Sequence, residues 1–366
     1  MKSQLGPQLM GLALMASIHA GLAQPTLNIA PAGNQSVLYW SATPKNCILQ
    51  SATNQSSPTW ITVNDATPVI AVTVSNTSPA RFFRLISTTP PAGMALIPAG
   101  SFTMGDTLDS ADDAIPTNIY VSAFYMDTNL VSSNQWATVY GYATNYGYGF
   151  DNAGAGKAAN YPVETVDWYD CVKWCNARSQ LAGLIPVYYT DAGMTQLYTN
   201  GDTDTIYVSW TNNGYRLPTE AEWEKAARGG LSGQRFPWGL TISESQANYY
   251  ADTNDYPYDS GPYNGYNTNF DIGGFPYTSP VGYFAPNGYG LYDMAGNVLE
   301  WCWDWYGTSL GQPTSNNPTG PTSGSNRACR GGCWGIRAIG MRCAARNHAL
   351  PYGTDTIFGI RCLRGL

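Results

Sequence analysis

The chain has 366 residues, 43% of them hydrophobic and 12% charged, and a formal net charge of −7. This length suffices for one small and one larger domain, and the hydrophobic content excludes a disordered chain. The negative balance, with no run of Lys or Arg, argues against nucleic acid or an anionic membrane surface as a partner. The abundance of Gly (39), Tyr (26), Pro (24) and Trp (12) predicts a loop-rich fold held by aromatic packing.

Residues 1–23 have the features of a signal peptide. Lys2 precedes an apolar run between Met10 and Ile18, and a small-x-small pattern follows at Gly21-Leu22-Ala23. The apolar run is too short to span a bilayer, which takes about 20 residues. We therefore expect no transmembrane segment, and a protein that is secreted, periplasmic or held at the cell surface.

Residues 24–87 predict a small β-sandwich-like module. Runs rich in β-branched and aromatic residues alternate with polar clusters at the spacing of an all-β unit. These runs are Val37–Trp40, Cys47–Gln50, Trp60–Val63, Val69–Val74 and Arg81–Ile86. The module is either a spacer, the preferred interpretation, or an attachment module for a surface or glycan. Residues 88–93, with two prolines and a glycine, form the linker to the next domain.

Residues 94–366 combine short strands and long loops with two predicted helices. Asp167 can cap the first helix, which places Cys171 and Cys175 one turn apart on one face. Thr219 and Glu222 match the capping box of the second helix, which the glycines at 229 and 230 end. The long loops between residues 248 and 275 need an anchor, and a bound cation would supply one.

Eight cysteines in an exported chain predict disulfide bonds. They are Cys47, Cys171, Cys175, Cys302, Cys329, Cys333, Cys343 and Cys362. Cys47 stands far from the others, so the remaining seven leave either one free thiol or one partner for Cys47. Cys171 and Cys175 could bind a metal together, but bonding to two separate cysteines is the preferred interpretation.

The stretch Ser279–Tyr306 is the most informative part of the sequence. Its Pro and Gly residues predict turns, and Asp293, Asn297 and Glu300 place oxygen ligands within eight residues of one another. Carboxylate and amide oxygens on a tight turn are typical of a metal-binding site.

Motifs spread over residues 94–366 occur in an order that resembles the formylglycine-generating enzyme, or sulfatase-modifying-factor, domain family. They are Met94–Gly105, Pro162–Trp168, Gly214–Glu224, Phe236–Gly239, Asn287–Tyr292, Gly296–Trp301, Arg330–Gly332, Arg342–Arg346 and Phe358–Cys362. The resemblance implies an α+β, C-type-lectin-like fold that is low in regular secondary structure and stabilised by Ca²⁺. The small all-β module precedes it.

The resemblance also implies ligands and a disulfide. The first calcium site would use the Asp293 and Glu300 side chains with the carbonyls of Gly296 and Val298. The second would use Asn248 and the Tyr249 carbonyl; Gly273 stands where the family has an Asp, so Asp271 is a shifted substitute. The implied disulfide joins Cys175 to Cys362. By the same geometry, we expect Cys171 to reach Cys343.

The motif for catalysis is incomplete. The family's enzymes hold copper(I) and the substrate cysteine with a C-x-x-x-x-C pair between the Gly-Gly and Arg-Cys motifs, because soft thiolates suit that ion. Here the interval from Cys333 to Arg342 is shorter and contains one cysteine. Cys329 and Cys333 are the candidates for a displaced pair. A three-histidine iron site, used by another branch of the family, is excluded because His348 alone follows the signal peptide.

Two functions follow from this sequence. The first is a calcium-stabilised binding module without copper, whose partner is an unknown protein or glycan. Its candidate contacts lie in the stretch 334–352, because aromatic and Arg side chains dominate binding hot spots. They are Trp334, Arg337, Arg346, His348 and Tyr352. The alternative is a divergent oxidase that converts a cysteine of a sulfatase peptide to formylglycine.

Overall fold

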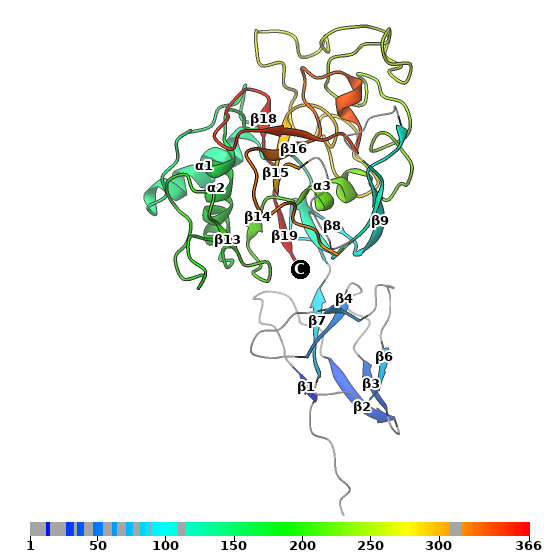
Figure 1. The fold of residues 1–366 in the computed structure, drawn as a ribbon, viewed down its shortest axis with the longest axis vertical. Coiled ribbons are helices and arrows are strands. Elements are labelled where there is room, and N and C mark those ends of the chain that lie inside the picture. The colour runs from blue at the N-terminus through cyan, green and yellow to red at the C-terminus, as the bar shows by residue number, and fades with distance from the viewer. Residues whose placement is uncertain are drawn as a thin grey trace, which may run out of the picture. The chain divides into compact units, whose positions relative to one another are not determined.

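The computed structural model describes residues 12–14, 27–32, 35–39, 47–53, 61–63, 71–75, 81–87, 89–108, 115–307 and 316–366. Contacts divide the chain into two compact units, residues 1–89 and 90–365 (Figure 1). Most of the expected signal peptide lies outside the described residues. In the part of the chain that is described, no helix combines the length and the apolar character needed to cross a membrane.

The N-terminal unit contains two sheets. One has the strand order β1-β7-β4-β5 and the other the order β2-β3-β6. The strands are β1 (Leu12–Leu14), β2 (Asn28–Ala32), β3 (Gln35–Tyr39), β4 (Cys47–Ala52), β5 (Ile61–Thr62), β6 (Ala71–Ser75) and β7 (Arg81–Ser87). Buried Leu38 of one sheet packs with Leu49 and Phe83 of the other. A strand is present in each of the five runs that the sequence indicated.

The larger unit is built from short strands in separate small sheets. Two four-stranded sheets, β14-β19-β11-β8 and β17-β16-β15-β18, form its centre, and the pairs β9-β10 and β12-β13 lie outside them. The strands are β8 (Met94–Ile97), β9 (Gly100–Met104), β10 (Thr117–Val121), β11 (Phe124–Asp127), β12 (Tyr188–Tyr189), β13 (Tyr207–Val208), β14 (Tyr215–Arg216), β15 (Leu299–Trp305), β16 (Arg327–Arg330), β17 (Asn347–Ala349), β18 (Phe358–Gly359) and β19 (Leu363–Gly365).

Both expected helices are present, and a third was not expected. α2 (Trp168–Leu181) begins at Asp167, whose side chain accepts from Asp170 N, and α3 (Glu220–Ala227) has the predicted capping box. The additional helix, α1 (Ser133–Asn145), lies beside α2 (Figure 1). A short 3-10 helix, η2 (Ala338–Met341), follows β16.

Aromatic side chains fill the core of the larger unit, as the composition predicted. Trp136 of α1 stacks on Trp174 of α2 at 5.2 Å and an interplanar angle of 2°. Between residues 231 and 298 the described chain has no named strand or helix. These loops close over a separate cluster that includes Phe236, Tyr249 and Met341. The expectation of an α+β fold with long ordered loops is confirmed.

Candidate functional site

Within the segment Ser279–Tyr306, residues 279–298 fold as a closed loop that leads into β15. Asn297 has a positive φ of 68°, which an Asn tolerates better than most residues. Its side-chain amide pairs with the Ser279 backbone in both directions: Ser279 N donates to Oδ1 at 3.0 Å, and Nδ2 donates to Ser279 O at 3.1 Å. Asn297 therefore holds the two ends of this loop together.

Asp293 has one carboxylate oxygen suited to a cation. Its Oδ2 accepts from Gly282 N at 2.7 Å, while Oδ1 is buried and has no hydrogen-bond partner among the described residues. Burial raises the pKa of Asp293 to about 6, against the opposing effects of the Gly282 hydrogen bond and the Arg361 charge. A desolvated oxygen without a donor is the kind of group that Ca²⁺ ligation would satisfy.

Glu300 is fully buried and already paired. Arg361 Nε lies 3.2 and 3.0 Å from its two oxygens, and Arg361 Nη2 donates to Oε1 at 3.0 Å. Trp223 Nε1 donates to Oε2 at 2.8 Å. An ionised carboxylate offers about four lone-pair sites, so these contacts use its accepting capacity. Among the residues expected to hold calcium, Asp293 thus fits the ion better than Glu300 does.

Asn248 and Asp271, which are expected at the second calcium site, lie in the long loops between α3 and β15. Asn248 is buried, its Nδ2 donates to Tyr277 O at 2.8 Å, and its carbonyl accepts from Asn297 N at 2.8 Å. Asp271 is exposed. The backbone carbonyls on either side of it accept from the Lys157 ammonium, whose Nζ donates to Phe270 O at 3.2 Å and to Ile272 O at 2.9 Å.

The cysteines of the larger unit are all buried. Burial raises the pKa of Cys329 well above its ordinary value and that of Cys333 to about 12. The thiolate is the form that binds metal and attacks electrophiles, so both thiols are in unfavourable surroundings for such chemistry. By contrast, the Sγ atoms of Cys175 and Cys362 lie 3.5 Å apart.

The expectation that Cys171 reaches Cys343 is wrong. Cys171 belongs to the core cluster around α1 and α2, where the nearby thiols are Cys329 and Cys362. Cys343 packs in a different cluster, beside α3 and its charged side chains. Spacing along a helix indicated which face Cys171 occupies but not which strand covers that face.

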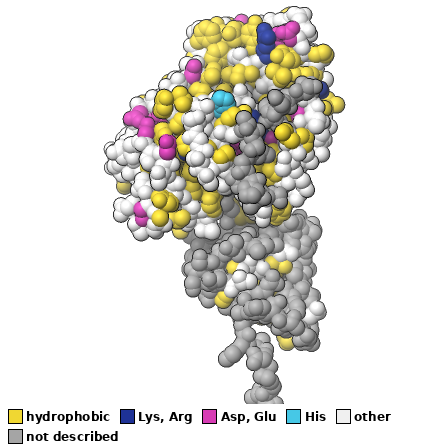
Figure 2. All heavy atoms as spheres, viewed as in Figure 1, with side chains coloured by type: hydrophobic (Ala, Val, Ile, Leu, Met, Phe, Trp, Pro, Cys, Tyr) yellow, Lys and Arg dark blue, Asp and Glu magenta, His cyan; other side chains and the backbone are white. Residues whose placement is uncertain are grey.

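Five aromatic rings gather where the long loops meet the segment after β16. We call this cluster, formed by Tyr250, Tyr266, Phe275, Tyr277 and Trp334, the aromatic face. Trp334 lies 5.3 Å from Phe275, 5.5 Å from Tyr277 and 5.9 Å from Tyr266, measured between ring centroids. Phe275 is 64% exposed. Hydrophobic side chains are widespread on the visible surface of the larger unit (Figure 2).

Of the expected contact residues, Trp334 belongs to this face and Arg337 lies at its edge. Trp334 is mostly buried, and its Nε1 donates to Thr356 O at 3.3 Å. Arg337 is 51% exposed and pairs with Asp252 at 3.2 Å and Asp255 at 3.3 Å. Its backbone bridges to Tyr250, one of the five rings.

The other three residues are placed differently. Arg346 does not belong to an exposed surface, and that expectation is wrong: it is buried and donates to both oxygens of Glu220, at 2.9 and 2.6 Å. His348 is exposed on β17, packs on the Tyr306 ring at 4.3 Å and contacts Asn326 Nδ2 through Nδ1 at 3.1 Å. Tyr352 is exposed.

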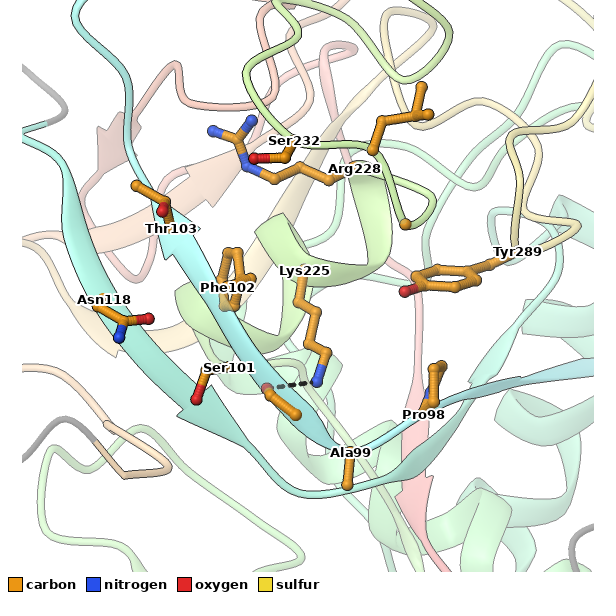
Figure 3. A pocket seen from close by; sticks show the side chains of 13 residues that line it. Pro98, Ala99, Ser101, Phe102, Thr103, Asn118, Lys225, Arg228, Ser232 and Tyr289 are labelled. Carbon is orange, nitrogen blue, oxygen red and sulfur yellow. Dashed lines mark hydrogen bonds between the residues drawn. The ribbon is translucent and has the colours of Figure 1, made fainter. Parts of the chain in front are cut away.

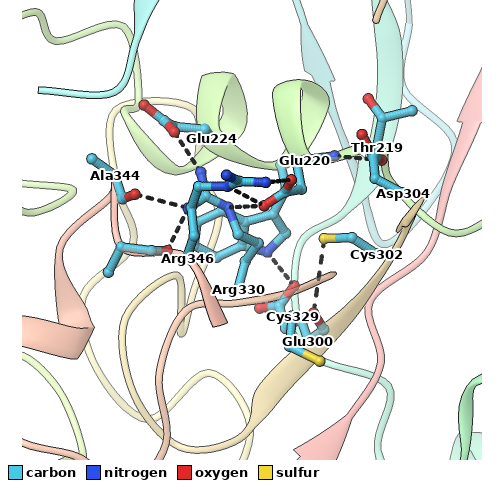
Figure 4. Close-up of polar contacts among 12 residues, drawn as sticks. Thr219, Glu220, Glu224, Glu300, Cys302, Asp304, Cys329, Arg330, Ala344 and Arg346 are labelled. Carbon is cyan, nitrogen blue, oxygen red and sulfur yellow. Dashed lines mark hydrogen bonds and ion pairs between the residues drawn. The ribbon is translucent and has the colours of Figure 1, made fainter. Parts of the chain in front are cut away.

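Arg346 belongs to a buried ionic network (Figure 4). Arg330 pairs with Glu224, and Arg228 Nη2 lies 2.6 Å from the other Glu224 oxygen. Asp304 Oδ2 accepts from Glu220 N at 2.9 Å, and burial raises the pKa of Asp304 well above its ordinary value. Since Arg330 and Arg346 are paired with buried carboxylates, the network positions β15, β16 and α3 rather than offering a reactive group.

Sequence reasoning missed a cavity of about 390 Å³ beside β9. Figure 3 shows Lys225 and Tyr289 reaching toward this strand, and Lys225 Nζ donates to Gly100 O at 2.7 Å. A cluster of Asp151, Asp167 and Asp202, with oxygens within 4.8 Å of one another, was missed as well. Both are assembled from distant segments and leave no local pattern in the sequence.

Two solved protein structures share the fold of this chain. Treponema denticola variable protein 1 superposes with a TM-score of 0.57 and 26% identity, covering 75% of this chain and 95% of that chain. PvdO from Pseudomonas aeruginosa gives a TM-score of 0.54 and 26% identity, covering 75% and 94%.

The family is established by sequence. Residues 83–366 match the family described as "Sulfatase-modifying factor enzyme 1-like domain", so the chain belongs to it. The formylglycine-generating enzyme of Bos taurus is 33% identical over 299 residues, covering 75% of this chain and 75% of that protein. The resemblance inferred from the ordered motifs is therefore confirmed.

Proposed function

We propose that this protein is a binding module that has kept the fold of its enzymatic relatives without their copper chemistry. The observation that carries the proposal is the lack of a second cysteine in the interval from Cys333 to Arg342. It contains one cysteine, and that thiol is buried and resists ionisation. A copper(I) site needs soft thiolates that can ionise and meet the ion together.

The aromatic face is the proposed recognition surface. Its rings contact one another, so a ligand would meet a fixed platform and would order few side chains on binding. Phe275 is the most exposed ring, and Arg337 adds a charged group at the edge. Aromatic and Arg side chains are the residue types that contribute most at binding hot spots.

The rival function is a divergent oxidase that uses Cys329 and Cys333, and sequence similarity to formylglycine-generating enzymes favours it. Purified protein, loaded with copper(I), is incubated with a sulfatase-type peptide containing one cysteine, and the peptide mass is followed. We expect no formylglycine and no change when Cys333 is replaced by Ser. Conversion of the peptide that Cys333→Ser abolishes would overturn the binding-module proposal.

We also propose that Ca²⁺ stabilises the loop of residues 279–298. Asp293, with the Gly296 and Val298 carbonyls, would hold the ion, and Glu300 would add negative charge from its pair with Arg361. The unpartnered Asp293 oxygen supports this proposal. Bound calcium would cross-link the loop, a structural role with no part in a reaction. A second ion at Asn248, Tyr249 and Asp271 has less support, because the Lys157 ammonium already donates to the carbonyls of Phe270 and Ile272.

Export is the last part of the proposal. Its support is the pattern of residues 1–23, which combines Lys2, an apolar run and a small-x-small site. Expression of the full chain in a secreting host, followed by N-terminal sequencing of the product, tests it. We expect the mature chain to begin at Gln24; an uncleaved chain confined to the cytosol would contradict export.

A further inference from the structure

Glu164 is a buried carboxylate whose surroundings do not satisfy it. Glu164 is 3% exposed, and its Oε2 has no hydrogen-bond partner among the described residues. Two charges act on it from neighbouring loops: Asp355 is repulsive and Lys157 is attractive. The Lys157 ammonium donates to the carbonyls of Phe270 and Ile272. A buried carboxylate oxygen without a donor costs folding free energy, so its retention calls for a partner.

The Glu164 segment is linked to the aromatic face through the loop of Asp355 and Thr356. Thr165 N, the next amide along the chain, donates to Asp355 O at 3.1 Å, and Trp334 Nε1 donates to Thr356 O at 3.3 Å. The loop of Asp355 and Thr356 therefore contacts both the Glu164 segment and the central ring of the face. On the other side, Lys157 connects the surroundings of Glu164 to the loop that ends at Phe275.

An aromatic platform and a carboxylate together recognise one class of ligand group. The faces of Trp, Tyr and Phe rings attract an ammonium or guanidinium ion, and a carboxylate accepts its N–H bonds. An anionic ligand would instead be repelled by Glu164 and Asp355, and a neutral glycan would leave the buried charge unbalanced.

Building on the proposed function, we infer that the aromatic face binds a protein partner through a basic side chain, Lys or Arg, whose N–H groups reach the Glu164 carboxylate. Glu164 is then the specificity-determining residue of the face, and the five rings supply the contact area. The partner's positive charge also complements the net charge of −7 on this chain.

Fluorescence anisotropy with the intact chain tests this inference. The probes are labelled dodecapeptides of one Gly/Ser sequence that carry Lys, Arg, Nε-acetyl-lysine or Glu at four positions. We expect the Lys and Arg peptides to bind at least tenfold more tightly than the other two. Glu164→Gln should weaken the binding of basic peptides at least fivefold and bring Lys level with acetyl-lysine. Asp191→Asn, which removes one negative charge elsewhere on the chain, should change nothing.

Measurements on the wild-type protein make the test independent of how the variant folds. Burial raises the pKa of Glu164 to about 7, an effect that Asp355 reinforces and Lys157 opposes. Protonation should therefore weaken basic-peptide binding as the pH falls from 8 to 5.5. Equal binding of basic peptides by Glu164→Gln and wild type, with no pH dependence, would overturn the inference.

Failure of the proposed function would look different. Phe275→Ala should weaken the binding of every peptide that uses the face. If acetyl-lysine peptides or arrayed glycans bind and lose affinity in Phe275→Ala, while Glu164→Gln behaves as wild type, the face binds ligands but the inference about charge is wrong. If the wild type binds no peptide and no glycan, both the inference and the proposed function fail.

Discussion

Cys175 and Cys362 meet in the core with their sulfur atoms 3.5 Å apart, although 187 positions separate them in the sequence. Cys175 lies on α2 and Cys362 directly precedes β19, so a covalent bond here would join the helix to the sheet β14-β19-β11-β8. The same pair is the one that resemblance to the family implied.

We expect these two cysteines to form a disulfide when the protein is made in an oxidising compartment. Closing so long a loop should stabilise the fold by about 2–5 kcal/mol. Alkylation of the unreduced, denatured protein followed by mass spectrometry should leave Cys175 and Cys362 unlabelled, and reduction should lower the melting temperature. Cys343→Ala serves as the control, since Cys343 lies in a different cluster. Full labelling of both residues before reduction would contradict the prediction.

The effect of Ca²⁺ on the melting temperature should distinguish Asp293 from Glu300. Asp293→Asn should leave the stability of calcium-free protein unchanged or higher, because it removes a desolvated carboxylate, and should abolish the rise in melting temperature on adding Ca²⁺. Glu300→Gln should cost about 3–5 kcal/mol with or without calcium, because it leaves Arg361 buried without its counter-charge. Melting curves in EDTA and in Ca²⁺ measure both. A normal calcium response in Asp293→Asn would refute the ligand assignment.

Arg327 is held between two indole rings. Its guanidinium carbon lies 3.6 Å from the Trp168 ring centroid and 3.4 Å from that of Trp305, and Nη1 donates to Trp303 O at 2.8 Å. Arg327→Lys should lower the free energy of unfolding by about 2 kcal/mol, because an ammonium cannot stack as a planar group between two rings. Urea denaturation measures this loss. Arg337→Lys, at an exposed ion pair, should change stability by less than about 1 kcal/mol.

One buried acid, Asp167, should stabilise the folded protein more at low pH than at high pH. Burial, reinforced by Asp170, raises the pKa of Asp167 to about 7 from 3.8. The folded state therefore binds this proton more tightly than the unfolded state does. The resulting stabilisation is complete below about pH 3.8 and is lost as the pH rises through 7.

Asp167→Asn isolates that contribution, because Asn caps a helix about as well as Asp. The variant should gain stability relative to wild type as the pH is raised from 5 to 8, by up to about 1.4 kcal/mol per pH unit. Urea midpoints at several pH values give the difference. A constant difference between the two proteins over this range would show that Asp167 does not titrate as described.

Local signals in the sequence predicted those parts of the fold that depend on neighbouring residues. The caps at Asp167 and Thr219 identified α2 and α3 because each side chain bonds an amide three residues away. α1 gave a weaker signal: Ser132 caps it, but its first turn has no acidic residue and Gly141 lies inside it. Its buried residues Trp136, Val139 and Ala143 show the helical spacing only once the packing against α2 is known.

Features that depend on distant partners could not be predicted in this way. Arg346 was a candidate contact because Arg side chains are enriched at binding hot spots, but its partner Glu220 is 126 positions away. Likewise, nothing around Glu164 in the sequence shows that its carboxylate lacks a donor. The recognised motifs fixed the family and the loop of Asp293, whereas the aromatic face came from residues 250, 266, 275, 277 and 334, which only the fold brings together.

The position of β19 in its sheet affects how the protein is made. β19 lies between β14 and β11, so residues 363–365 complete the middle of the sheet and not its edge. A ribosome must therefore release almost the whole of residues 90–365 before this sheet can close, and exposed edges persist until then. Chaperone assistance during synthesis, and sensitivity to small deletions near residue 363, are expected consequences.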